Sequence, residues 1–161
     1  MAAFDADTAR LGLEDEVSLG SDSGGWVALA VDREEDALAL TVRGAEPPGA
    51  EPAVEVTLLL EHHAARELHL WFTLALAAAT WGSAGEDGEG PEMYDTQEGL
   101  LYPGELAVTY TPGEERPFTL EAIDYEETQE GVSAAVELSV ADARELYPLL
   151  TMVVLAMGAL S

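Results

Sequence analysis

The sequence predicts an α+β protein made of two βββα repeats related by a pseudo-two-fold axis. Stretches of alternating apolar and polar residues occur in two groups of three, and each group is followed by a long apolar run. Two short motifs also recur: Leu29-Ala30-Val31 returns as Leu106-Ala107-Val108 after 77 residues, and Ala65-Arg66-Glu67-Leu68 returns as Ala143-Arg144-Glu145-Leu146 after 78. We therefore expect antiparallel sheet with two apolar helices packed on one face.

The first repeat is expected to span residues 26–81, after an acidic N-terminal segment at 1–25. An acidic stretch at 32–36 predicts the turn between its first two strands. Three prolines and two glycines between Gly44 and Pro52 predict a loop. The expected elements are strands at 26–31, 37–43 and 54–60 and a helix at 61–81.

The second repeat is expected at residues 100–161, after an acidic, glycine-rich linker at 82–99 that reads as a loop. Ser139 is a good N-cap for the last helix, with Asp142 three residues later as in a capping box. Pro148 should either kink this helix or start a new one. The expected elements are strands at 105–110, 118–125 and 132–138 and a helix from 139 towards 160. At 161 residues, a single domain at 1–161 is expected.

Both helices are expected to be almost free of charge. Residues 68–81 and 149–160 contain no Asp, Glu or Arg, and neither run is long enough to span a membrane. One small sheet cannot cover two helices that are apolar on every side, so we expect a homo-oligomer that buries them. The candidate partner-binding residues are Leu149, Met152, Val153 and Met157 on the last helix, and Met93 and Tyr94 in the linker.

The chain is strongly acidic, with 32 carboxylates, six arginines, no lysine and a formal net charge of −26. Three interpretations remain open: adaptation to concentrated salt, mimicry of nucleic acid by an inhibitor, and an acidic module that binds a protein partner. Direct binding to nucleic acid or to a membrane is not expected, because there is no basic patch.

Few residues are candidates for chemistry. The absence of cysteine excludes disulfides and thiolate catalysis, and no phosphate-binding loop, dinucleotide fingerprint or nucleophile elbow is present. All three histidines, His62, His63 and His69, lie within one helix start and could bind a divalent metal ion, or could simply pack there. Arg66 and Arg144 occupy matching positions and could clamp an anion or form ion pairs. No cofactor is expected.

The sequence thus favours a non-enzymatic interaction or structural protein, adapted to high salt and oligomerising through its apolar helices. The alternatives are a nucleic-acid mimic that inhibits a DNA-binding enzyme, a chaperone-like dimer that binds a peptide, and a histidine-based metal protein. The first residues lack the basic and apolar regions of a signal peptide, so a cytoplasmic or virion-associated protein is expected.

Overall fold

The computed structural model describes residues 17–21, 24–44, 54–82, 93–97, 104–125 and 132–158. The expected N-terminal segment up to residue 16 and most of the expected linker lie outside these residues. In chain order the elements are β1 (Val17–Gly20), β2 (Trp26–Asp32), β3 (Ala37–Arg43), β4 (Glu55–Leu60), α2 (His62–Ala77), β5 (Met93–Gln97), β6 (Gly104–Tyr110), β7 (Phe118–Asp124), β8 (Val132–Leu138) and α3 (Val140–Ala156).

The predicted fold class is confirmed, with one more strand in each repeat than the sequence predicted. β1 to β4 form one antiparallel four-stranded sheet, called sheet A, and β5 to β8 form a second, called sheet B. A helix follows each sheet. The extra strands, β1 and β5, fall in the expected N-terminal segment and the expected linker. They are short, and β5 is largely polar, so neither gives an alternating pattern long enough to recognise.

The strand registers show which residues of the two repeats correspond. Leu29 pairs with Leu40 in sheet A, while Val108 pairs with Leu120 in sheet B. Leu40 in turn pairs with Leu58, and Leu120 with Val136, so β4 and β8 match at the predicted offset of 78. The counterpart of Leu29 is therefore Val108. The 77-residue motif pairs the wrong residues, because loops of different length prevent one offset from aligning every strand.

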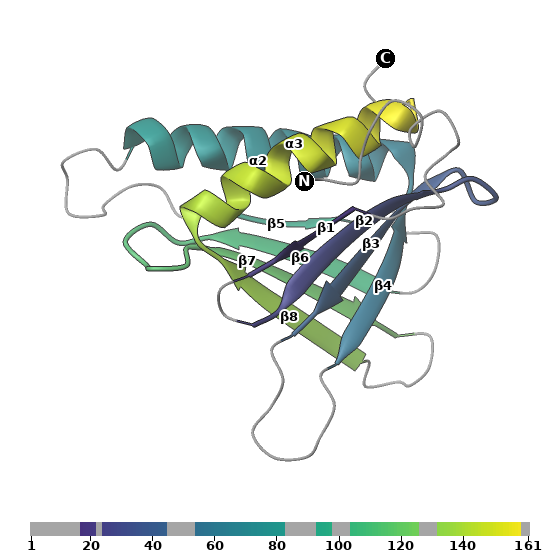
Figure 1. Cartoon of the computed structure of the whole chain (residues 1–161), viewed down its shortest axis with the longest axis horizontal. Coiled ribbons are helices and arrows are strands. Elements are labelled where there is room, and N and C mark those ends of the chain that lie inside the picture. The colour runs from purple at the N-terminus through teal and green to yellow at the C-terminus, as the bar shows by residue number, and fades with distance from the viewer. Residues whose placement is uncertain are drawn as a thin grey trace.

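The inner faces of the two sheets share a single core, which the helices close (Figure 1). β3 and β4 pack against β7 and β8, and each helix also reaches the first strand of the other repeat: α2 contacts β5, and α3 contacts β1. This exchange follows the pseudo-two-fold relation that the sequence predicted. Apolar residues at alternate positions of the strands fill the space between the layers.

The chain is closely packed around Gly25, just before β2, where sheet A lies against β8 of sheet B. A Cβ atom at Gly25 would lie 2.6 Å from the Arg43 carbonyl oxygen and 3.0 Å from Cγ2 of Val136. The hydroxyl of Ser21 donates a hydrogen bond to the backbone carbonyl of Glu137 on β8. Position 25 therefore requires glycine, which has no side chain.

The helices begin near the expected residues but end differently. α2 continues into a π-helical turn at Ala78–Gly82. Ser139 caps α3, its Oγ accepting a 3.1 Å hydrogen bond from the amide of Asp142, as predicted. α3 runs unbroken through Pro148, which is exposed and has no N–H to donate to the Arg144 carbonyl one turn earlier. Among the described residues, no helix combines the length and apolar character needed to cross a bilayer.

Candidate functional site

The two helices meet at a pair of stacked rings on the pseudo-two-fold axis. His69 and Tyr147 occupy equivalent positions at the 78-residue offset, and their ring centroids are 5.0 Å apart with the planes inclined by 22°. Two threonines at equivalent positions complete the arrangement. His69 Nε2 lies 2.8 Å from Oγ1 of Thr151, and the Tyr147 hydroxyl lies 2.6 Å from Oγ1 of Thr73. We call these four residues the seam.

The hydrogen bonds of the seam have a defined direction. Thr73 Oγ1 donates to the backbone carbonyl of His69, and Thr151 Oγ1 donates to that of Tyr147, both at 2.9 Å. Each threonine has only one proton to give, so His69 Nε2–H must donate to Thr151, and Tyr147 must donate to Thr73. Burial lowers the pKa of His69 below its ordinary 6.5, which favours this neutral ring at neutral pH.

The three histidines are held by different partners. His62 Nε2 lies 3.0 Å from an Asp36 carboxylate oxygen in the β2–β3 turn, and His63 Nδ1 lies 3.7 Å from Glu61. His69 is committed to the seam. Within the described part of the chain, no three His, Asp or Glu side chains are placed to hold one metal ion. The geometry therefore gives no support to the histidine metal site considered from the sequence.

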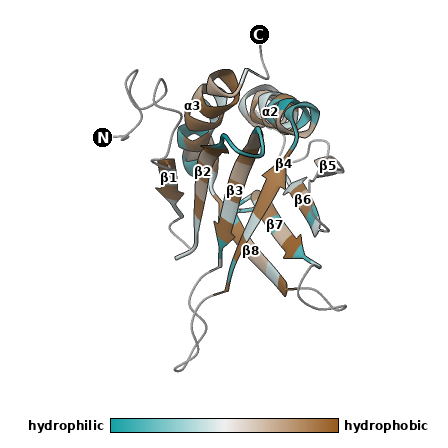
Figure 2. Cartoon of the chain, turned by 90° about the vertical axis from the view of Figure 1, so that its right-hand side faces the viewer, coloured by the Kyte–Doolittle hydropathy of each residue, from teal (hydrophilic) through white to brown (hydrophobic). Residues whose placement is uncertain are grey.

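The outward surface of α2 and α3 is apolar and exposed. Leu70, Leu74, Met152 and Leu155 have exposed fractions of 55%, 53%, 38% and 54%. Spacings of four residues in α2 and three in α3 place each pair on one helix face, and Pro148 lies on the same exposed side. We call these five residues the helix-pair surface. Figure 2 shows α3 mainly in the colour of apolar residues.

Charged residues are confined to the first two turns of each helix. After Glu67, α2 and its π-helical extension contain no charged residue, and after Glu145 the same holds for α3 as far as Gly158. In a chain with a net charge of −26, an uncharged exposed surface needs an explanation.

The partner-binding residues expected from the sequence divide into exposed and buried groups. Met152 and Tyr94 are exposed, at 38% and 66%, and Leu149 and Met93 are partly buried against the core. Val153 and Met157 are buried, because they lie on the side of α3 that faces the sheets, and this removes them from any surface of the folded chain. The sequence-based prediction missed Leu70 and Leu74. Their spacing of four residues was the signal that could have placed them together on one helix face.

Of the two matched arginines, Arg144 has a hydrogen-bond partner within the fold. Arg144 Nη2 donates a 3.1 Å hydrogen bond to the hydroxyl of Thr80, at the end of the neighbouring helix. This bond joins the start of α3 to the end of α2 and supports a structural role. Its partner is a hydroxyl and not the carboxylate that the sequence suggested.

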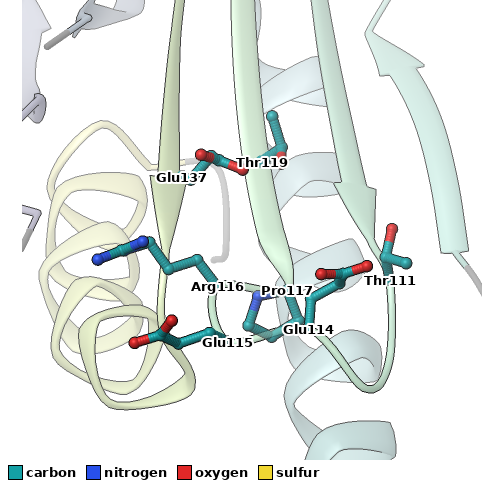
Figure 3. A pocket seen from close by; sticks show the side chains of 7 residues that line it. All are labelled: Thr111, Glu114, Glu115, Arg116, Pro117, Thr119 and Glu137. Atoms are coloured by element: carbon teal, nitrogen blue, oxygen red, sulfur yellow. The ribbon is translucent and has the colours of Figure 1, made fainter. Parts of the chain in front are cut away.

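A polar cavity of about 420 Å³ lies at the turn between β6 and β7. Figure 3 shows Glu137 beside Thr119, with Arg116 and the glutamates of the turn further along. Three glutamates and one arginine give the cavity a charged, mainly acidic lining, and no histidine is among its lining residues. The lining residues are Thr111, Glu114, Glu115, Arg116, Pro117, Thr119 and Glu137.

Comparison of the chain with protein-family models, curated proteins and solved structures finds no significant match. No activity or ligand can be carried over from a relative. The surfaces of the two repeats are therefore the basis for inferring function.

Proposed function

We propose that this chain is a non-enzymatic interaction or structural protein that self-associates through the helix-pair surface and is adapted to concentrated salt. The observation that carries the proposal is the exposure of Leu70, Leu74 and Leu155, each more than half exposed, on the uncharged parts of two paired helices. The occupant of this surface is a second copy of the chain, whose own helix pair would complete a layer of four helices.

Burial of the helix-pair surface supplies the driving force for association. Complete burial of a leucine side chain contributes about 1.5–3 kcal/mol, and roughly half of that is still available to a half-exposed leucine. The surface has the pseudo-two-fold symmetry of the seam beneath it, so it is suited to a symmetric contact between identical surfaces. The charged first turns, with Arg66, Glu67, Arg144 and Glu145, would form a polar rim around it.

The net charge decides which surfaces of two copies can meet. Two chains that each carry −26 repel one another at low salt, and the repulsion is weakest where neither presents carboxylates. At about 1 M salt the Debye length falls to about 3 Å, so the remaining repulsion is largely screened. A basic partner, in contrast, would be drawn to the acidic surfaces of the chain. The uncharged helix surface therefore fits a second copy better than it fits a basic protein.

Sedimentation velocity between 0.1 and 3 M KCl tests the proposal. The wild-type chain should assemble as salt rises, and Leu74→Glu should sediment as a smaller species, because association would bury an unpaired carboxylate. Tyr125→Glu is the matched control: it adds the same charge at a residue that is 42% exposed but lies at the end of β7. A folded wild-type chain that is monomeric at 3 M KCl would overturn the proposal.

The outer face of sheet B favours a second candidate function, an acidic mimic that binds a DNA-binding enzyme. Glu105, Glu121 and Glu137 lie on three neighbouring strands, each offset by two residues from the next, and form a diagonal stripe. Diagonal neighbours of this kind are about 7–8 Å apart. Such a stripe presents ordered negative charge, as the mimic hypothesis requires.

Competition with duplex DNA tests this second function. The chain should displace DNA from a susceptible member of a panel of DNA-binding enzymes, and the combined variant Glu105→Gln, Glu121→Gln and Glu137→Gln should lose this effect. The matched control neutralises Glu34, Glu35 and Glu55 on the first repeat. Equal losses in the two triple variants would reduce the effect to net charge and remove the stripe as a specific site.

A further inference from the structure

The seam lies within the helix-pair surface, so a second copy that binds this surface also covers the seam. In both helices a seam residue is followed directly by a residue of the helix-pair surface: His69 by Leu70, Thr73 by Leu74 and Thr151 by Met152. His69 and Thr151 are only partly buried and Thr73 is exposed, so water reaches the seam in the single chain. Association through the helix-pair surface would remove this water.

The hydrogen bonds of the seam leave one place on His69 for a second proton. Its Nε2–H donates to Thr151, whose own proton goes to the backbone carbonyl of Tyr147. The second proton must therefore bind at Nδ1. In the described part of the chain, Nδ1 has no hydrogen-bond partner. A protonated ring thus depends on water to solvate its charge and its Nδ1–H group.

The groups around His69 do not neutralise a charged ring. It meets Tyr147 and Thr151 from α3, and Arg66, which is positively charged, lies one turn earlier on α2. β3 and β4, which α2 also contacts, have apolar inner faces. Asp95 lies on the inner face of β5, but no carboxylate of the described residues forms an ion pair with His69. Burial already lowers the pKa of His69 in the single chain.

We propose that His69 makes self-association through the helix-pair surface pH-dependent: two copies bind while the ring is neutral and separate when it is protonated. This inference rests on the self-association proposed above. The seam lies on the pseudo-two-fold axis of the surface, so a symmetric contact brings the His69 rings of both copies close to one axis. Protonation would then bury two like charges between apolar surfaces, at a cost that a single chain in water does not meet.

Proton linkage gives the direction of the effect. Covering the ring lowers its pKa further, so separated chains bind protons more readily than the pair does. Association is therefore at full strength above the pKa of His69 in the single chain and weakens as pH falls through it. With two rings in each pair, the dissociation constant should rise about tenfold between pH 7.5 and 5.5. Protonation of carboxylates relieves repulsion and acts in the opposite direction, but concentrated KCl screens that contribution.

Sedimentation velocity at 3 M KCl and pH 7.5, 6.5 and 5.5, over a range of protein concentrations, tests the proposal. The wild type should weaken about tenfold more than His69→Gln, whose neutral amide can still donate to Thr151. His69→Tyr, which gives α2 the ring that α3 has at Tyr147, is the second variant should the first not fold. His63→Gln is the matched control, because His63 is exposed beside Glu61, and it should follow the wild type.

The outcomes separate the switch from the contact itself. Equal pH dependence in the wild type, His69→Gln and His69→Tyr overturns the switch and leaves the self-association standing. A wild type that is folded but monomeric at pH 7.5 overturns the self-association, and the switch with it. Loss of the pH dependence in His63→Gln as well as in His69→Gln would assign the effect to general charge at the start of α2 and overturn the role of the seam.

Proton NMR reads the ring directly. The Cε1–H signal of His69, assigned by its absence in His69→Gln, should titrate at lower pH in a concentrated, assembled sample than in a sample diluted below the dissociation constant. The signal of His63 should titrate alike in both samples. A His69 midpoint that does not change with assembly would contradict the switch.

Discussion

The two repeats share a backbone plan but differ on the surfaces that the plan leaves free. In both sheets the inner positions are apolar, because they must fill one core, and equivalent residues such as Leu58 and Val136 keep this character. The outer positions have no such constraint. There the first repeat has threonine and leucine where the second has Glu121 and Glu137. Because this difference in charge is confined to the outer faces, it changes the surface of each sheet and leaves the shared core alone.

The repeats also differ inside the core. Tyr110 and Phe118 of the second repeat pack with Trp71 and Phe72 of α2, with neighbouring ring centroids 5.0–6.2 Å apart. The register gives Val31 and Leu38 as the counterparts of Tyr110 and Phe118. One side of the core is therefore aromatic and the other aliphatic. Burial of the Tyr110 hydroxyl raises the pKa of that residue.

The largest expected effect on the free energy of unfolding comes from removing the ring of Phe118, at the centre of the aromatic side of the core. Phe118 is completely buried and contacts three other rings, so Phe118→Ala should cost about 3–5 kcal/mol of unfolding free energy. Leu38→Ala, the matched change on the aliphatic side, leaves a smaller cavity and should cost less, nearer to about 3 kcal/mol. Urea unfolding of both variants at one KCl concentration gives the comparison. An equal or larger cost at Leu38 would contradict the idea that the aromatic side anchors the core.

A substitution where the two sheets meet should have the next largest effect. The added methyl group in Gly25→Ala would overlap the Arg43 carbonyl at 2.6 Å, so the corner must shift, at a cost of about 1–3 kcal/mol. Gly20→Ala is the control, because nothing lies within 4 Å of the point that its added methyl group would occupy, and it should change stability by less than about 0.5 kcal/mol. Equal effects of the two substitutions would show that stability does not depend on the close approach of Gly25 to the Arg43 carbonyl.

The sequence predicted the longer elements because their inner faces follow a regular period. Val56, Leu58 and Leu60 align with Ala134, Val136 and Leu138 in both sequence and structure, and the repeated Ala-Arg-Glu-Leu motif occupies matching helix positions. β1 and β5 were not predicted, because edge strands of four and five residues carry too few alternating positions.

The candidate surfaces were only partly predictable. The lack of charge in both helices was plain from the sequence, but which side of α3 faces the core depends on packing. Val153 and Met157 were therefore expected on a surface from which they are absent. The seam joins residues that are up to 82 positions apart, such as His69 and Thr151, and only the fold brings them together.

Neutralising part of sheet B should make it more like sheet A and reduce the need for salt. The double variant Glu121→Thr and Glu137→Leu removes two of 32 carboxylates, so its melting temperature at 0.1 M KCl should rise. The gain in unfolding free energy should be roughly 0.2–1 kcal/mol and should shrink towards 3 M KCl, where repulsion is screened. Neutralising Glu34 and Glu35, in the exposed β2–β3 turn, is the control for a general charge effect. An unchanged gain across the salt range would show that the acids of sheet B do not oppose folding electrostatically.

The smallest expected effect concerns His69, because the equivalent seam residue of the second repeat is a different ring, Tyr147. Burial lowers the pKa of His69 in the folded chain below 6.5, so the unfolded chain binds a proton more readily. His69 therefore contributes its full stabilisation at pH values above its pKa in the unfolded chain. This contribution declines as the pH falls from about 7 through that pKa. Protonation of carboxylates acts in the opposite direction by relieving repulsion, so the useful quantity is the difference between wild type and His69→Gln. Melting temperatures measured from pH 7.5 to 5.5 should fall more in the wild type than in this variant, whereas His63→Gln, at an exposed position, should follow the wild type. Parallel curves for wild type and His69→Gln would mean that the seam accepts a charged ring as readily as a neutral one, and Tyr147 would then stack equally well on either form.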